Sequence, residues 1–473
     1  MVLGADARRR PAAGRPVALA AALLVALAAT AAMVVGCSEQ APVTGGEGAT
    51  TLPPSGAVTP AEGDGVTVLS MFNGEQWFDG AVPVPVNADP TRDPVKVGFV
   101  NVDAGPIGAM PELHTSTVAA VEFINAELGG VDGRPVQLVP CILSNPMSPD
   151  ESQACGRKLV AEDVVAVLGG IGLSQGPLLG VLADNDVPYV GGLPVNEAEM
   201  SSTNSFQFSG GGPGAFVAFA DQAVRKDRAD RVAVLYADYP SIRQAAVDYG
   251  ATLARSLGAR QVTEVPFPMG SQDYSAAVQK AVEADPQAIF VGAADMACTP
   301  ILQALADLRS TAQVYMVGSC ADRKFLDKVG LDKVAGTRFN VENRIDMAQV
   351  PEADFPIYLE AMTRYGKGTN ALGAATVSFR DAMNLWAVLT DAAPKVTGAT
   401  VTAQLRAASG RPSFGGHPYT CDGRQVPAMP ALCAPQQVIA EIKKDGSFSE
   451  ASDGWIDVPT VLSAHPVPQP AQR

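Results

Sequence analysis

One short segment combines residue types that could do covalent chemistry. Residues 172–176 read Gly-Leu-Ser-Gln-Gly and match G-x-S-x-G, between an apolar run that ends at Leu168 and a stretch of helical character. In α/β-hydrolases this motif exposes a nucleophilic serine on a tight strand-to-helix turn. A secreted serine esterase with Ser174 as nucleophile and His417 as base is therefore one hypothesis. Three residues separate the strand from the motif and no His-Gly-Gly sequence precedes it, which weakens this hypothesis.

The same segment fits a role without catalysis. A glycine-rich turn at the start of a helix presents backbone amides, which favour an anionic group such as a carboxylate. A turn that only connects strand and helix is a further alternative. We expect a ligand-binding turn in which Gly172 and Ser174 face the ligand.

Residues that hold metals or phosphates are sparse. The chain has three histidines, no C-x-x-C pair and no G-x-x-x-x-G-K-[ST] sequence. The glycine run at 210–214 lacks the lysine of a phosphate-binding loop and favours a hinge. We therefore expect neither a metal nor a cofactor.

The seven cysteines favour an oxidising compartment. If Cys37 is modified as described below, six remain, and they fall into three local pairs along the chain. Six cysteines allow fifteen pairings, so the pairing of neighbours is a hypothesis, and zinc ligation is an alternative. The neighbouring pairs are Cys141 with Cys155, Cys298 with Cys320, and Cys421 with Cys433.

Composition excludes several classes of function. The chain has 473 residues, 47% of them hydrophobic and 18% charged, which is typical of globular proteins. The formal net charge is −15, so nucleic-acid binding through phosphates is not expected.

The N-terminus has the pattern of an export signal. Four arginines precede an uncharged apolar run from Val17 to Val35, and Val-Val-Gly-Cys ends at Cys37. This end resembles the bacterial lipobox, which implies a signal peptide over residues 1–36 and a lipid anchor on Cys37. An uncleaved membrane anchor is the alternative. Residues 37–93 predict a lipid anchor and flexible tether, because their first half is rich in Gly, Pro and Thr.

From Val95 onward, apolar strand-like runs alternate with helical patterns. A glycine break at 210–212 divides them into two series, each of which predicts a doubly wound parallel sheet. The fold class is thus α/β, with two lobes and a ligand cleft at the carboxyl ends of the strands. We assign residues 94–212 with 342–415 to lobe 1, residues 213–341 with 416–458 to lobe 2, and 459–473 to a loose tail.

The order of several motifs resembles a known family. VKVGFV…AGPIG…AAVEFINAELGGVDGRPVQ over 95–137, SPDESQACGRKLVAEDVVAVLGG over 148–170 and the Gln-Asp-Tyr-Ser turn at 272–275 resemble the type 1 solute-binding proteins of ABC importers, the leucine/isoleucine/valine-binding group. The resemblance covers about 95–442. Cys421-Asp-Gly with Cys433 resembles a disulfide hairpin of actinobacterial members.

The resemblance implies a set of ligand-binding residues. The turn at Gly172 and Ser174 corresponds to the one that holds the ligand carboxylate, and Asn196 lies in the next turn. Tyr239 corresponds to an aromatic residue at the cleft. The acid that holds the ligand amine is missing at 318–321, so Asp295 or Asp322 is expected to replace it.

Together these features predict a non-enzymatic, extracytoplasmic solute-binding protein, lipid-anchored to the outer face of the cell membrane. It is expected to be a monomer that delivers a small polar organic solute, amino-acid or amide-like, to an ABC importer permease. The inferred cleft loops carry no Lys or Arg, which favours a neutral or zwitterionic ligand over a multiply anionic one. A sensor of the same fold that does not transport is the alternative, and the Ser174 esterase is third.

Overall fold

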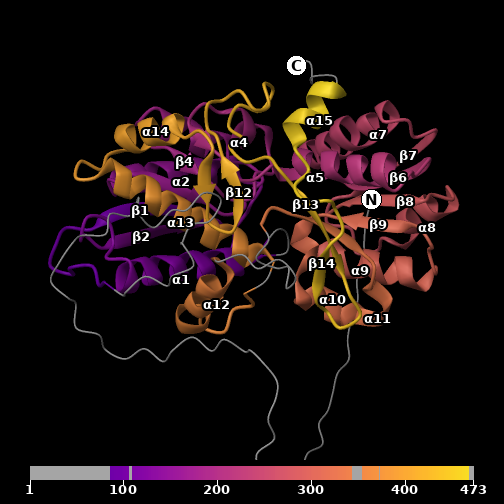
Figure 1. Cartoon of the computed structure of the whole chain (residues 1–473), viewed down its shortest axis with the longest axis horizontal. Coiled ribbons are helices and arrows are strands. Elements are labelled where there is room, and N and C mark those ends of the chain that lie inside the picture. The colour runs from indigo at the N-terminus through magenta and orange to yellow at the C-terminus, as the bar shows by residue number, and fades with distance from the viewer. Residues whose placement is uncertain (1–85, 106–108, 294, 344–353, 372, 468–473) are drawn as a thin grey trace, which may run out of the picture. The chain divides into compact units, whose positions relative to one another are not determined.

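The computed structural model describes residues 86–105, 109–293, 295–343, 354–371 and 373–467. The chain divides into two units between Gly63 and Asp64, and the first unit lies outside the described residues. The predicted signal peptide, Cys37 and nearly all of the predicted tether also lie outside them. Figure 1 labels the helices and strands of the second unit.

Lobe 1 is built on a five-stranded parallel sheet in the order β2-β1-β3-β4-β5. Helix α1 packs against α12 and α13, and α2 packs against α3. The strands are β1 (Val95–Asn101), β2 (Val136–Ile142), β3 (Ala166–Gly169), β4 (Tyr189–Val190) and β5 (Ser205–Phe206). The helices are α1 (Pro111–Glu127), α2 (Pro149–Ala161), α3 (Gly176–Ala183), α4 (Glu197–Ser201), α12 (Asp354–Tyr365), α13 (Ala374–Ala392) and α14 (Gly398–Ala407).

Lobe 2 contains a seven-stranded sheet in the order β14-β13-β10-β9-β8-β6-β7. The strands are β6 (Arg231–Asp238), β7 (Gln261–Pro268), β8 (Ala288–Gly292), β9 (Gln313–Met316), β10 (Arg338–Val341), β13 (Val438–Ile442) and β14 (Phe448–Glu450), the last two antiparallel to their neighbours. The helices are α5 (Gly211–Ala220) with η2 (Asp221–Lys226), α6 (Pro240–Arg243) with η3 (Gln244–Ala251) and α7 (Thr252–Ser256), α8 (Ser275–Glu283), α9 (Asp295–Asp307), η4 (Gly318–Ala321), α10 (Arg323–Val329), α11 (Leu331–Val334) and α15 (Val458–Ala464).

The burial of each strand follows its place in the sheet. In the interior strand β1 every residue except Lys96 is buried, which accounts for its continuous apolar run. The edge strand β2 buries only Val136 fully. The same contrast holds in lobe 2, where β8 is wholly buried and the edge strand β7 is half exposed. The two predicted α/β lobes are therefore confirmed.

Helix α2 begins at a capped first turn that contains a proline. Ser148 is its N-cap and accepts a hydrogen bond from Glu151 N, and Pro149 occupies the first turn. The Glu151 side chain, however, accepts hydrogen bonds from Ser144 and Asn145 instead of completing a capping box.

Three connecting segments join the lobes, and their described residues are 207–210, 342–343 and 420–437. The second is described only at Glu342 and Asn343. A two-stranded sheet of β11 (Arg411–Ser413) and β12 (Gly416–Tyr419) precedes the third. Tyr419 is buried in the core of lobe 1, so residues 416–419 pack with lobe 1 and differ from their assignment to lobe 2. The aromatic ring of Tyr419 is stabilised by burial among the apolar side chains of lobe 1, although its segment lies close in sequence to strands of lobe 2.

The C-terminal segment also differs from the expected loose tail. Helix α15 is capped by Asp457, which accepts a hydrogen bond from Thr460 N, and Val461 is buried in the core of lobe 2. A capped turn with one buried face is ordered in spite of its prolines.

The structure contains the three disulfides expected from neighbouring cysteines: Cys141–Cys155, Cys298–Cys320 and Cys421–Cys433. The first ties β2 to α2, and the second ties α9 to the turn after β9. The neighbour pairing is confirmed.

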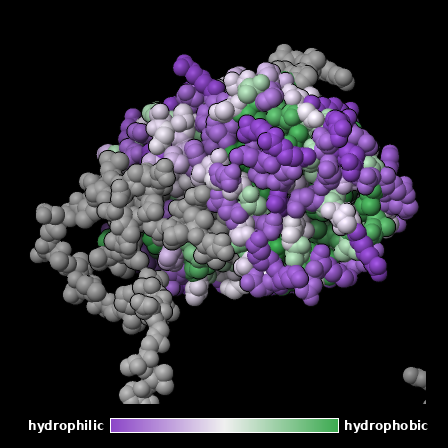
Figure 2. All heavy atoms as spheres, turned by 45° about the vertical axis from the view of Figure 1, so that its right-hand side comes forward, coloured by the Kyte–Doolittle hydropathy of each residue, from purple (hydrophilic) through white to green (hydrophobic). Residues whose placement is uncertain are grey.

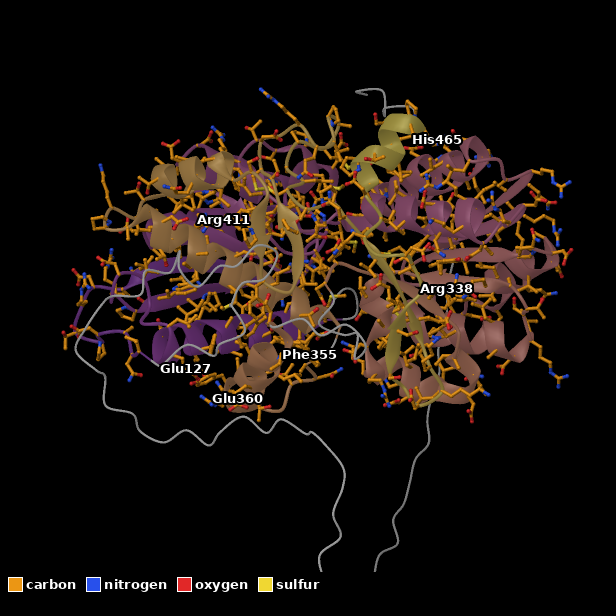
Figure 3. The ribbon with its side chains drawn as sticks, in the orientation of Figure 1. Glu127, Arg338, Phe355, Glu360, Arg411 and His465 are labelled. Carbon is orange, nitrogen blue, oxygen red and sulfur yellow. A yellow bond between two sulfur atoms is a disulfide. The ribbon has the colours of Figure 1, made fainter. Side chains whose placement is uncertain are left out.

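The described surface carries few large apolar side chains. Val86, Ile142, Met147, Leu308 and Leu359 are the exposed ones among the described residues. Figure 2 shows one face, on which hydrophilic residues predominate over smaller apolar areas. Charged pairs bridge neighbouring helices. Arg364 of α12 bonds Glu127 of α1, and it also bonds Glu360 within α12. Figure 3 labels Glu127 and Glu360.

Candidate functional site

A cavity of about 180 Å³ lies where the loops of the two lobes face each other. A single water needs only about 10–15 Å³ of such volume, so the cavity can hold a small organic molecule. Its wall comes from loops after β3, β4, β6, β8 and β9, and from the start of α13. This is the carboxyl edge of both sheets, where open α/β folds bind ligands.

The wall of the cavity is mostly apolar. Both lobes contribute, and the large side chains are Met110, Ile171, Leu173, Leu193 and Val377 from lobe 1 and Phe216, Ile242 and Met269 from lobe 2. No Lys, Arg or His occurs among the described lining residues, and the acidic ones are Asp295 and Glu342.

Two polar atoms of the wall have no partner in the described structure. Asp295 Oδ1 and Ser241 Oγ are both buried, and neither makes a hydrogen bond. Asp295 is the first residue of α9, and Ser241 lies in α6. A buried polar atom without a partner costs free energy, so each of these atoms can gain from a donor or acceptor on a ligand.

The glycine-rich turn contributes less than expected. Leu173 lines the cavity, whereas Gly172 is buried beside the Gln175 side chain and Ser174 is half-buried next to Leu173. Several amides at this edge already donate within the protein: Ile171 N to Asn101, Leu173 N to Pro146 and Leu193 N to Gly170.

Asn196 and Tyr239 lie beside the cavity and have structural partners. Asn196 caps α4 through a hydrogen bond from Glu199 N, and its Nδ2 also donates to Gly172 O at 3.3 Å. Tyr239 Oη donates to Leu173 O at 3.0 Å, which joins lobe 2 to lobe 1. Burial raises the pKa of Tyr239, so the phenol keeps its proton for this bond.

Of the two candidate acids, the structure places Asp295 in the wall and gives Asp322 another role. Asp322 is the N-cap of α10, accepts a hydrogen bond from Lys324 N and accepts another from Asn370 Nδ2 at 3.1 Å. Lys324 Nζ lies 3.6 Å from Asp322 and bonds Glu112 of lobe 1 at 2.7 Å.

Burial alone would lower the pKa of Lys324. The hydrogen bond to Glu112 and the charges of Glu112, Asp322 and Asp295 outweigh the burial and raise that pKa. Lys324 therefore stays charged and forms a further polar contact between the lobes.

A charged cluster at the connecting segments was not foreseen from the sequence. The buried carboxylate of Glu342 accepts hydrogen bonds from Ser209 Oγ at 2.7 Å, Gly210 N at 2.9 Å and Gln437 Nε2 at 2.9 Å. These three partners belong to the first and third connecting segments, and Glu342 itself belongs to the second.

The cluster continues into α13. Arg380 is 1% exposed, lies 3.7 Å from Glu342 and donates to Asp381 at 3.2 Å. Asp381 Oδ2 accepts from Gly192 N at 2.6 Å. The sequence carries one signal of this cluster, the adjacent charged residues Arg380 and Asp381 in a mostly apolar helix. Charged side chains are buried only when they are paired.

The pairing that an esterase needs does not occur in this structure. His114 bonds Asp103, His465 lies 3.3 Å from Ser256, and the ring of His417 packs on Trp455. No hydrogen bond between Ser174 and a histidine occurs among the described residues.

The described residues contain no cluster of three or more His, Cys, Asp or Glu that could hold a metal ion. Within the same residues, no helix is long and apolar enough to span a membrane.

Two α/β lobes, three connecting segments and a cavity between facing loops define a two-lobed binding protein. The sequence profile described as periplasmic binding protein matches residues 94–434. The chain belongs to this family. No curated protein matches the chain in a sequence search.

Solved structures with the same fold come from several bacteria. A leucine-binding protein of Thermotoga maritima has a TM-score of 0.62 at 18% identity, over 77% of this chain and 99% of that one. A solute-binding protein of Rhodopseudomonas palustris, solved with 4-hydroxybenzoate, has a TM-score of 0.65 at 17% identity, over 77% and 97%. An ABC transporter substrate-binding protein of Sphaerobacter thermophilus has a TM-score of 0.64 at 18% identity, over 77% and 98%. At these identities the similarity establishes the fold.

Proposed function

We propose that the protein is the extracytoplasmic solute receptor of an ABC importer. Its ligand is a small polar organic molecule, amino-acid or amide-like, held in the cavity between the lobes. The observation that carries the proposal is the cavity itself, because a family member with a cavity between its two lobes can couple binding to lobe closure. Contacts from both lobes to one ligand shift the open–closed equilibrium toward the closed form.

We further propose that residues 1–36 are removed, that Cys37 is lipidated and that 37–93 include the tether. The mature receptor then acts as a monomer at the outer face of the membrane and meets the importer permease there. The N-terminal basic residues, the apolar run and the Val-Val-Gly-Cys end support this.

A thermal-shift screen of the chain from Ser38 onward tests the receptor function. The library contains amino acids, amides, amines, polyamines and sugars. A true ligand at about 100 times its dissociation constant stabilises the fold by about 2.7 kcal/mol. If no class of compound raises the melting temperature, the proposed function is wrong.

The role of Ser174 is tested on the best compound of the screen. If Ser174 Oγ bonds a charged group of the ligand, Ser174→Ala should weaken binding by about 1.5–3 kcal/mol in isothermal titration. Ser271→Ala is the control, because Ser271 is a half-buried turn serine outside the cavity wall. Equal affinity of Ser174→Ala and Ser271→Ala would remove Ser174 from the site.

A further inference from the structure

The wall of the cavity is better suited to an amine than to a whole amino acid. We propose that the solute is a hydrophobic monoamine without a carboxylate, whose ammonium group pairs with Asp295. This inference rests on the proposed receptor function and assigns it an amine ligand in place of an amino-acid-like or amide-like one.

The acidic side chain of Asp295 has an oxygen without a hydrogen-bond partner. Asp295 Oδ1 is buried in the wall without a hydrogen bond, although a carboxylate oxygen is a strong acceptor. Leaving such an atom without a donor is expensive, and charge-assisted donors satisfy it best. The Ser241 hydroxyl, also buried and without a partner, lines the same cavity and can gain a further hydrogen bond from a ligand.

The charged groups around Asp295 leave an excess of negative charge. Lys324 is the cation whose charge acts on Asp295, and it already pairs with Glu112 at 2.7 Å and Asp322 at 3.6 Å. The charges of three carboxylates, those of Glu112, Asp322 and Asp295, thus act on one ammonium group. The excess of negative charge attracts a ligand cation and disfavours a ligand anion.

The described wall offers no cationic partner to a ligand carboxylate. No Lys, Arg or His lines the cavity. Glu342 would repel an anion, and its own oxygen Oε1 is occupied by three donors. The amides of Ile171, Leu173, Gly192 and Leu193 donate to protein acceptors and are not available to a ligand.

Apart from these polar groups, the wall of the cavity is mostly apolar. Side chains such as Leu173, Phe216, Ile242 and Met269 match an aliphatic or aromatic body. Burying that body contributes about 25 cal/mol per Å² of apolar surface. Sugars and polyamines lack such a body.

The test compares ligands that share one body and differ in the head group. Isopentylamine, leucine, isocaproate and isopentyl alcohol form one series; phenethylamine, phenylalanine, hydrocinnamate and phenethyl alcohol form the other. Isothermal titration of the chain from Ser38 onward should show that an amine binds about tenfold or more tightly than its amino acid and its alcohol, with no binding of the carboxylates.

Asp295→Asn tests the pairing directly. It should weaken amine binding about tenfold and leave alcohol binding unchanged. Asp238→Asn is the control, because Asp238 is exposed, belongs to the same lobe and does not line the cavity. Thermal melts of both variants establish that they fold.

The outcomes separate this inference from the receptor function. Tighter binding of leucine or phenylalanine than of the matched amine overturns the inference and leaves the receptor function intact. Binding of other library compounds without binding of any amine also overturns the inference and leaves the receptor function intact. Equal losses in Asp295→Asn and Asp238→Asn overturn the role of Asp295. A library without any ligand overturns the receptor function itself.

Discussion

Asp381 connects a cleft loop to the charged cluster at the connecting segments. Its carboxylate accepts from Gly192 N, next to the cavity residue Leu193, and from Arg380, which in turn faces Glu342. Burial raises the pKa of Asp381 to about 6, although the charge of Arg380 and the Gly192 amide oppose this rise. Its protonation state therefore changes within a mildly acidic range.

We predict that this residue makes the free energy of unfolding depend on pH with a defined sign. Between the ordinary pKa of 3.8 and the folded value of about 6, the folded chain keeps a proton that the unfolded chain has released. The stability of the wild type relative to Asp381→Asn should therefore fall as pH rises from about 4 to about 6, by up to about 3 kcal/mol, and stay constant above. Urea unfolding at a series of pH values measures it.

Asp445→Asn provides a control of opposite sign. Hydrogen bonds from the Ser447 side chain and amide lower the pKa of the exposed Asp445. Stability relative to this variant should rise with pH through the acidic range. The same sign for both variants would contradict the assignment of Asp381.

At the scale of elements, the Cys298–Cys320 disulfide holds two loops of the cavity wall together. Cys298 lies in the first turn of α9 after Asp295, and Cys320 follows the lining residues Gly318 and Ser319. The disulfide thus fixes the place of the acid relative to the turn after β9.

Removing this disulfide should affect both folding and binding. The double variant Cys298→Ala/Cys320→Ala should lose about 3 kcal/mol of stability in the chain-entropy description and also bind the screened ligand more weakly. Cys141→Ala/Cys155→Ala should lose similar stability with unchanged affinity, since neither residue lines the cavity. Urea unfolding and isothermal titration give the two quantities, and unchanged affinity in both double variants would contradict a role of Cys298–Cys320 in the site.

Glu342 acts at the same scale, because its one carboxylate joins all three connecting segments. Glu342→Ala removes the acceptor of three hydrogen bonds and one of the two carboxylates that lie near the buried Arg380. We predict a loss of about 3–5 kcal/mol in the free energy of unfolding.

Glu360→Ala is the matched control for Glu342→Ala. Glu360 pairs with Arg364 on the exposed side of α12, so its removal should cost less than about 1 kcal/mol. If urea unfolding gives equal losses of stability for the two variants, Glu342 stabilises the fold no more than a surface ion pair does.

At the scale of the whole molecule, the prediction concerns attachment. If Cys37 carries the lipid, the form of Cys37→Ala that is cut from its signal peptide in an actinobacterial host should leave the detergent phase and the membrane fraction, because the sequence directly after Cys37 carries few large apolar residues. Phase partitioning and immunoblotting of cell fractions measure this. Retention of the cut variant in the membrane would contradict lipidation, whereas an uncut variant keeps the apolar run from Val17 to Val35 and is distinguished by its larger size. Ser38→Ala is the control and should remain attached.

The local pattern of the sequence determined most of the architecture. Buried parallel strands such as β1 and β8 are continuous apolar runs, and Ser148 followed by Pro149 sets the start of α2 whatever surrounds it. Neighbouring cysteines could pair as expected because each pair links adjacent strand, helix or turn segments.

The site depended on contacts that no local pattern contains. Asp295 and Asp322 both follow strands of lobe 2, yet only Asp295 lines the cavity, since a helix N-terminus and Asn370 of lobe 1 engage Asp322. Glu342 meets Ser209 across a separation of 133 residues. Hydrophobic periodicity fixes which face of an element is buried, whereas the packing of the two lobes decides which polar groups meet and which one is left for a ligand.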